Sequence, residues 1–151
     1  MARTPGRSAA LKRLVRAQVA ALNARNLDRL VALYAEDALL EFPASPTVRG
    51  RTAIQAAYAR YFRDWEETVT LERVVVSGGR VAAEGATTGQ HRAVQLKIPG
   101  RIPIPLRAYR HEFSASWEVR GGKIRRHRVS YDSDDLIRQL LEGVGDQPVK
   151  R

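Results

Sequence analysis

Three side chains in the last third of the chain could carry out acid/base chemistry. His111, His127 and Tyr131 lie in two stretches in which apolar and polar residues alternate, and a period of two is typical of β-strands with one buried face. An imidazole titrates near neutral pH, so it needs little adjustment to act as a general acid or base. A tyrosine hydroxyl can donate to an oxygen that gains negative charge. We expect all three side chains to face one interior.

A β-hairpin would position these side chains. Residues 109–119 are predicted to form its first strand and residues 123–131 its second, with Gly121-Gly122 supplying the positive φ angles of the turn. Pairing about this turn brings His111 closer to Tyr131 than to His127. A histidine and a tyrosine in contact would make a general acid/base unit. The alternative is that the histidines are hydrogen-bonded core residues.

Helices upstream of the hairpin would cover its apolar face. Apolar residues recur at three- and four-residue spacing over residues 9–22, 27–34 and 53–65, and this period predicts helices. Asn26 and Thr52 can cap the second and third of them. The third helix is unusually aromatic, so its inner face could line an apolar cavity as well as pack on a sheet.

Further strands would complete a sheet. Alternation and β-branched residues predict strands at residues 39–42, 68–76 and 81–91. The last of these is rich in Ala and Gly, and small side chains leave room for a cavity beside a strand. Residues 97–106 contain several prolines and are predicted to form a loop at the rim of that cavity.

The order of these elements indicates an α+β fold, with helices packed on one curved antiparallel sheet. A closing helix is predicted at residues 136–141, after Asp132, whose side chain can cap it. We expect one domain over residues 9–142, between a disordered tail at residues 1–8 and a second tail at residues 143–151.

The composition limits the function. The 151-residue chain has no cysteine, which excludes disulfides and thiolate metal sites, and no spacing of His, Asp and Glu is typical of a metal site. Basic residues interrupt the N-terminal stretch, so we expect no secretory signal, no membrane span and a cytoplasmic location. The net charge of +10 could attract nucleic acid or an anionic surface. Because much of it gathers at the termini and one turn, we interpret it as solvated surface charge.

Six short motifs follow one another along the chain. They are Leu-Tyr-Ala-Glu-Asp-Ala at residues 33–38, Val-Arg-Gly-Arg-Thr-Ala-Ile at 48–54, Glu-Gly-Ala-Thr-Thr-Gly at 84–89, the proline-rich stretch at 98–107, the return strand from Gly-Lys-Ile at 122–124 to Tyr-Asp at 131–132, and Leu-Ile-Arg-Gln-Leu at 136–140. In this order they resemble the nuclear transport factor 2-like superfamily, and within it the SnoaL-like polyketide cyclase and ester cyclase group. The resemblance implies a cone-shaped α+β fold that encloses a pocket, chemistry without a cofactor, and a homodimer through the open face of the sheet.

The resemblance also identifies positions at which relatives carry catalytic groups. In the ketosteroid isomerase branch a carboxylate base follows the first strand and a tyrosine lies in the first helix, and these positions hold Phe42 and Gln18. In the cyclase group and the related limonene-type epoxide hydrolases an aspartate on the last strand aligns with Val129. The histidine of the group's Gly-Thr-His-Thr-Gly motif aligns with Thr87. The acidic residues of the relatives are thus replaced at Phe42 and Val129.

The resulting prediction is a cofactor-free cyclase, isomerase or hydrolase that acts on a hydrophobic, oxygenated small molecule such as a polyketide or terpenoid. His111 would be the principal acid/base, with Tyr131 and His127 orienting the substrate. The expected substrate-binding residues are Phe42, Tyr58, Phe62, Trp65, Thr87, Gln90, Phe113, Trp117 and Val129, with His91 and Arg107 near the mouth. The alternative is a non-catalytic module of the same fold that binds a small molecule or a partner. Binding to nucleic acid or an anionic surface, which rests on charge alone, ranks third.

Overall fold

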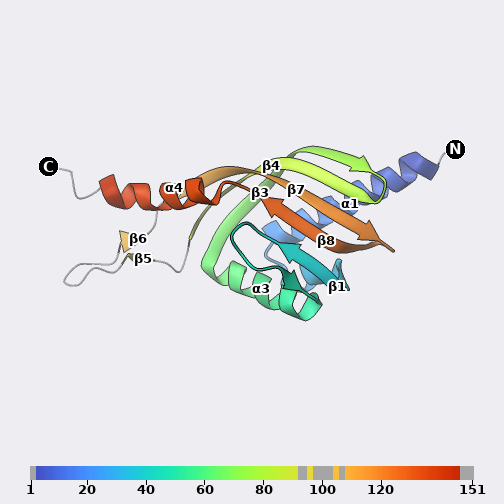
Figure 1. Ribbon diagram of the computed structural model, residues 1–151, viewed down its shortest axis with the longest axis horizontal. Helices are drawn as coiled ribbons and strands as arrows, with labels where there is room; N and C mark the ends of the chain where they lie inside the picture. Colours follow the sequence, from blue (N-terminus) through green and yellow to red (C-terminus); the bar gives the residue numbers. More distant parts are fainter. Residues whose placement is uncertain (1–2, 92–94, 97–103, 106–107, 147–151) are drawn as a thin grey trace.

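The fold is a helix-covered mixed sheet (Figure 1), seen in a computed structural model that describes residues 3–91, 95–96, 104–105 and 108–146. Its elements are α1 (Arg3–Asn23), α2 (Leu27–Ala32), β1 (Tyr34–Glu41), β2 (Val48–Arg49), α3 (Arg51–Asp64), β3 (Trp65–Ser77), β4 (Arg80–His91), β5 (Gln95–Leu96), β6 (Ile104–Pro105), β7 (Tyr109–Arg120), β8 (Lys123–Ser130) and α4 (Ser133–Asp146). The order of elements confirms the predicted α+β fold.

The main sheet has the strand order β2-β1-β8-β7-β4-β3. Its neighbouring strands are antiparallel, as predicted, except that β1 runs parallel to β8. The short strands β5 and β6 pair with each other in a separate sheet. Most of the loop predicted at residues 97–106 lies outside the described residues. The strand order places the β7–β8 hairpin in the middle of the main sheet, where both of its edges are paired.

The hairpin of β7 and β8 follows the prediction. Side chains along β7 alternate between buried and more exposed, with the odd-numbered positions inward, because successive residues of a strand point to opposite faces. Gly121 and Gly122 have φ angles of 62° and 76° at the turn. Trp117 pairs with His127 in the resulting register. Local sequence alone therefore specifies this part of the fold.

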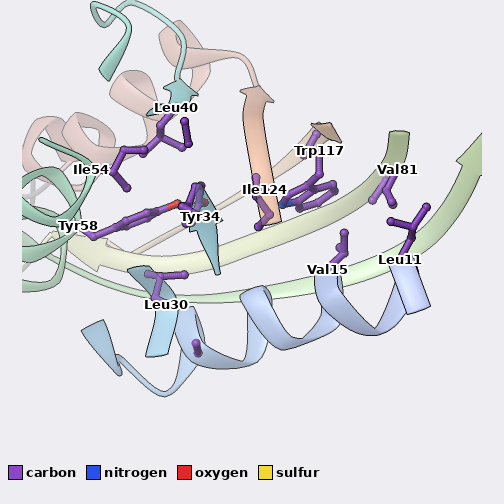
Figure 2. Close-up of a cluster of buried hydrophobic side chains, with 14 of the residues drawn as sticks. Leu11, Val15, Leu30, Tyr34, Leu40, Ile54, Tyr58, Val81, Trp117 and Ile124 are labelled. Atoms are coloured by element: carbon purple, nitrogen blue, oxygen red, sulfur yellow. The ribbon is translucent and has the colours of Figure 1, made fainter. Parts of the chain in front are cut away.

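Three helices cover the inner face of the sheet. α1 packs against β3 and β4, α3 against β1, and α4 against β7. Figure 2 shows Leu11 and Val15 of α1 pointing toward Val81 and Trp117 of the sheet. Val15, Val81 and Trp117 are at most 1% exposed, and burial of an apolar side chain of this size contributes about 1.5–3 kcal/mol. This packing fixes the face of the sheet on which a cavity can form.

Two helices are longer than predicted. α1 begins at Arg3, inside the stretch predicted as a disordered tail. Pro5 falls in its first turn, where a backbone N–H has no partner within the helix, so proline is tolerated there. α4 begins at Ser133 and continues to Asp146, beyond the predicted end at residue 141. The predicted cap is confirmed, since Oδ1 of Asp132 accepts from the N–H of Asp135 at 3.0 Å. No helix in the described ranges has the length and apolar character that crossing a membrane requires.

Two boundaries in the N-terminal half of the chain were predicted wrongly. Tyr34, expected on a helix, is the first residue of β1, where it pairs with Ile124 of β8 and is fully buried. Thr52 does not cap α3, because the helix starts at Arg51, two residues before the predicted start, and Gly50 takes the cap position with a φ of 92°. The cap predicted at Asn26 is confirmed by its hydrogen bond from the N–H of Arg29 at 3.1 Å. Pairing with a distant strand overrides the local helical pattern at Tyr34.

Candidate functional site

A cavity of about 660 Å³ lies between the sheet and the helices α1, α3 and α4. Its wall is largely apolar. The lining side chains that bear polar groups are Gln18, Ser45, Thr47, Tyr58, Arg60, Tyr61, Asp64, Trp65, Glu67, Thr87, His111, Trp117, His127 and Tyr131. A cavity of this size, with polar groups set into an apolar and aromatic wall, is typical of small-molecule sites.

His111 and Tyr131 meet at one end of this cavity. Their ring centroids are 4.5 Å apart with the planes tilted by 31°, which confirms the predicted contact. Tyr109 stacks near His111 at 5.9 Å. Nδ1 of His111 lies 3.4 Å from the carbonyl oxygen of Glu112. The imidazole is only 8% exposed, yet it lines the cavity, so a bound molecule could reach it.

His127 belongs to a separate buried cluster at the other end. Its ring stacks on Trp117 at 4.7 Å, and its Nδ1 lies 3.0 Å from the hydroxyl of Tyr34. That hydroxyl is also 2.9 Å from the hydroxyl of Tyr58 and accepts from Nε2 of Gln18 at 3.2 Å. Burial lowers the pKa of His127 to about 3, because desolvation disfavours the charged imidazolium. His127 is therefore a neutral hydrogen-bonding group near pH 7.

Burial also keeps the tyrosines of this cluster protonated. The pKa of Tyr34 is raised well above its usual value, first by burial and then by Tyr58. Burial raises the pKa of Tyr58 to about 12. Phenolate forms are thus absent near neutral pH. The cluster can orient a ligand oxygen by hydrogen bonding.

Glu67 is a cavity residue that the sequence analysis missed. It lies on β3 and faces the cavity, and its Oε1 and Oε2 accept hydrogen bonds from the hydroxyls of Tyr61 and Tyr109 respectively. Burial, followed by the charge of Glu67, raises the pKa of both tyrosines. The sequence did hold a signal, since Trp65, Glu67 and Val69 share the inward parity of the strand.

The predicted substrate-binding residues divide into two groups. Seven of them line the cavity: Phe42, Tyr58, Trp65, Thr87, Phe113, Trp117 and Val129. Phe62 and Gln90 do not. Phe62 stacks on Tyr58 at 6.3 Å, and the guanidinium of Arg25 lies 5.0 Å above its ring. Gln90 is exposed, and its Nε2 donates to Glu66 at 3.1 Å on the outer side of the strands.

The small residues of β4 and the residues near the predicted mouth of the cavity were also compared with the structure. The small residues of β4 were expected to leave a void, but the space beside Gly85 holds the ring of Phe113, whose Cζ would lie 2.9 Å from a Cβ at residue 85. Glu84 is exposed on the outer face, because it alternates along β4 with the buried residues Ala83 and Gly85. Arg107 and the side chain of His91 lie outside the described residues.

Solved structures of other proteins share this fold. Among solved structures, the chain is similar to a protein from Xanthomonas campestris pv. campestris that carries a provisional polyketide cyclase assignment, with 26% identity over 88% of this chain and 98% of that one and a TM-score of 0.74. A protein from Pseudomonas putida KT2440 with the same provisional assignment shares 27% identity over 84% and 95% of the two chains, with a TM-score of 0.69.

More distant neighbours share the fold. An LEH-like epoxide hydrolase from Mycobacterium tuberculosis matches 95% of this chain and 98% of its own at 22% identity, with a TM-score of 0.74. No curated protein matches the chain. The profile of the SnoaL-like domain matches residues 15–127, which is well over half of the sequence. The chain therefore belongs to the SnoaL-like domain family, with the nuclear transport factor 2-like fold that its motifs predicted.

Proposed function

We propose that the protein is an enzyme that performs acid/base chemistry on a hydrophobic, oxygenated small molecule such as a polyketide or terpenoid. The reaction would be a cyclisation, an isomerisation or a hydrolysis. His111 would take and return the proton, while Tyr131 and the neutral His127 would hold the oxygen atoms of the substrate. The assignments of the structural neighbours as polyketide cyclases and an epoxide hydrolase agree with this class of substrate.

The position of His111 opposite Thr87 carries the proposal. Relatives in the cyclase group place a histidine at the position of Thr87. In this chain Thr87 pairs directly with His111 across the β4–β7 ladder, and directly opposed residues have Cβ atoms about 4.5–5.5 Å apart. His111 thus brings an imidazole to the same part of the cavity wall from the neighbouring strand. This arrangement supports a retained acid/base role despite the change at Thr87.

A substrate screen tests this proposal. The protein would be incubated with panels of hydrophobic β-polyketones, esters and epoxides, and products would be detected by mass spectrometry. With a turned-over compound, we expect His111→Asn to lower kcat by about 10²- to 10⁴-fold, the usual contribution of a general acid or base. Glu112→Gln, on the opposite face of the same strand, is the matched control and should leave kcat unchanged. Equal turnover by His111→Asn and the wild-type protein would rule out the assigned role.

A binding module of the same fold is the second candidate. Phe42 and Val129 stand where relatives carry acidic residues, and both line the cavity as apolar side chains. This exchange removes proton-transfer groups and adds apolar surface, as expected of a protein that only holds its ligand. The outcome that favours it is tight binding of a screened compound without conversion, together with equal affinity in His111→Asn.

We also propose, from the family resemblance, a cytoplasmic homodimer that forms through the open face of the sheet. Ser114 is exposed at the middle of that face, between Glu84 of β4 and Ser130 of β8. Ser114→Arg should convert a dimer to monomers in analytical ultracentrifugation. A monomeric wild-type protein would contradict the proposal.

A further inference from the structure

Glu67 differs from the other half-buried carboxylates whose side chains the structure describes. Among the described side chains, the carboxylates that form ion pairs with arginines include every half-buried one except Glu67; they are Asp37, Glu41, Asp64, Glu72, Glu118 and Asp135. Within the described part of the chain Glu67 pairs with no cationic side chain, although the sequence holds 26 lysines and arginines. A half-buried charge without a counter-ion is costly, so this carboxylate facing a cavity requires an explanation.

Two tyrosines hold the Glu67 carboxylate in place. Tyr61 of α3 donates to Oε1, and Tyr109 of β7 donates to Oε2. A carboxylate offers about four lone-pair sites, so each oxygen keeps capacity for a further partner from the cavity. Gly89, directly opposite in the ladder, permits this placement, because a Cβ there would lie only 2.8 Å from Cγ of Glu67.

The wall around this carboxylate is aromatic. Trp65 and Tyr109 meet edge to face at 5.8 Å, and the rings of His111 and Tyr131 continue the series beside Tyr109. Of these rings, those of Trp65, His111 and Tyr131 line the cavity together with Tyr61. The faces of aromatic rings attract cations, and the attraction grows when the cation is desolvated. A fixed carboxylate beside such rings has the chemistry that binds an ammonium group.

We propose that this end of the cavity binds a cationic head group, a tertiary or quaternary ammonium, with Glu67 as its counter-ion and the rings of Tyr61, Trp65 and Tyr131 around it. The ligand would be a hydrophobic, oxygenated molecule that carries one positive nitrogen. The inference rests on the proposed function only in placing a small-molecule ligand in the cavity. Arg60 also lines the cavity, but its side chain is exposed on α3 and forms no ion pair with Glu67.

Two probes of equal shape show whether affinity depends on the positive charge or on the size of the head group. Choline carries a trimethylammonium group, and 3,3-dimethyl-1-butanol replaces its nitrogen with a neutral carbon. We expect the wild-type protein to bind choline at least tenfold more tightly in calorimetry or NMR titration, as cation–π contacts and the charge attraction to Glu67 predict. Equal affinity for the two probes, or no choline binding at millimolar concentration, would overturn the proposal.

Two variants test whether choline binds at Glu67. Glu67→Gln keeps the size of the side chain but removes the charge, and it should abolish the preference for choline. Asp64→Asn is the matched control, because Asp64 lines the same cavity but is paired with Arg63, and it should keep the preference. An unchanged preference in Glu67→Gln would contradict the proposal.

The two tryptophans give a readout that needs no variant at Glu67. Choline should shift the indole N–H resonance of Trp65 and leave that of Trp117, at the far end of the cavity, unchanged. Shifts at Trp117 alone would place the cation elsewhere and contradict the proposal. His111→Asn, which tests the proposed catalysis, should still prefer choline, so failure of either proposal can be recognised separately.

Discussion

At the scale of single residues, the two cavity histidines have different neighbours. His111 stacks near Tyr109 and lies beside the Tyr131 ring at the end of the cavity that also holds the Glu67 charge. His127 is enclosed by Trp117 and Tyr34, with no carboxylate among the causes of its shifted pKa. We therefore propose different roles for the two residues, an acid/base for His111 and a neutral hydrogen-bonding group for His127.

Acid should destabilise the fold through His127. Its pKa of about 3 in the folded state lies below the usual 6.5, so between these values the unfolded state binds a proton that the folded state does not. Stability is then unaffected above pH 6.5 and falls by up to about 1.4 kcal/mol for each pH unit below it. His127→Asn should remove this contribution.

Urea unfolding at a series of pH values measures the effect. Aspartates and glutamates titrate in the same range, but they are common to both proteins, so the difference in unfolding free energy between wild type and His127→Asn isolates the imidazole. We expect that difference to move in favour of the variant as the pH falls from about 6.5 toward 3. A pH-independent difference would show that His127 is not held neutral.

Gly89 is a second residue whose environment leads to a prediction. A Cβ there would lie 2.8 Å and 2.9 Å from Cγ and Cα of Glu67, so Gly89→Ala should force β3 and β4 apart. Such overpacking costs about 1–3 kcal/mol, measurable by denaturant unfolding, and it should also weaken choline binding by displacing Glu67. A variant of wild-type stability would contradict the close approach of the strands.

At the scale of elements, local features were predictable from the sequence and contacts between distant segments were not. The β7–β8 hairpin is specified locally, by alternation and by Gly121-Gly122, and its prediction was correct. Tyr34 was misplaced because its strand pairs with β8, about ninety residues away in sequence. The bond from Tyr109 to Glu67 spans 42 residues, and it depends on the joint register of β3, β4 and β7. Contacts of this kind leave no short-range pattern to detect.

Helix α1 offers a test of the early helix start. Gly6 lies in its N-terminal part, is exposed, and a Cβ there would meet no atom within 4 Å. Alanine at an exposed helical position is more stable than glycine by about 0.5–1 kcal/mol. Gly6→Ala should therefore raise the unfolding free energy by that amount. No change on substitution would favour the disordered tail that the sequence predicted for residues 1–8.

At the scale of the whole molecule, acidic residues neutralise part of the basic charge. Arg126 makes two hydrogen bonds to Glu41, each of 3.1 Å, and Arg128 adds a third of 2.8 Å. These bonds lower the pKa of Glu41, with those from Arg126 the larger cause. Glu41 thus stays ionised into the acid range and holds two of the hairpin arginines on the outer face. The net charge of +10 already counts these carboxylates, so the pairing does not lower the sum but decides which arginines are free to contact a polyanion.

The response to a polyanion should therefore depend on Glu41. Because phosphate contacts release counterions, binding to random-sequence duplex DNA should be weak and should fall steeply as salt rises from 50 to 200 mM. Glu41→Gln removes the partner of Arg126 and Arg128, so it should increase DNA affinity at low salt and steepen the salt dependence in fluorescence anisotropy titrations. Glu84→Gln makes the same charge change at a residue with no ion pair among those described, and it should have a smaller effect. Tight, salt-resistant DNA binding by the wild-type protein would instead make nucleic acid a specific partner.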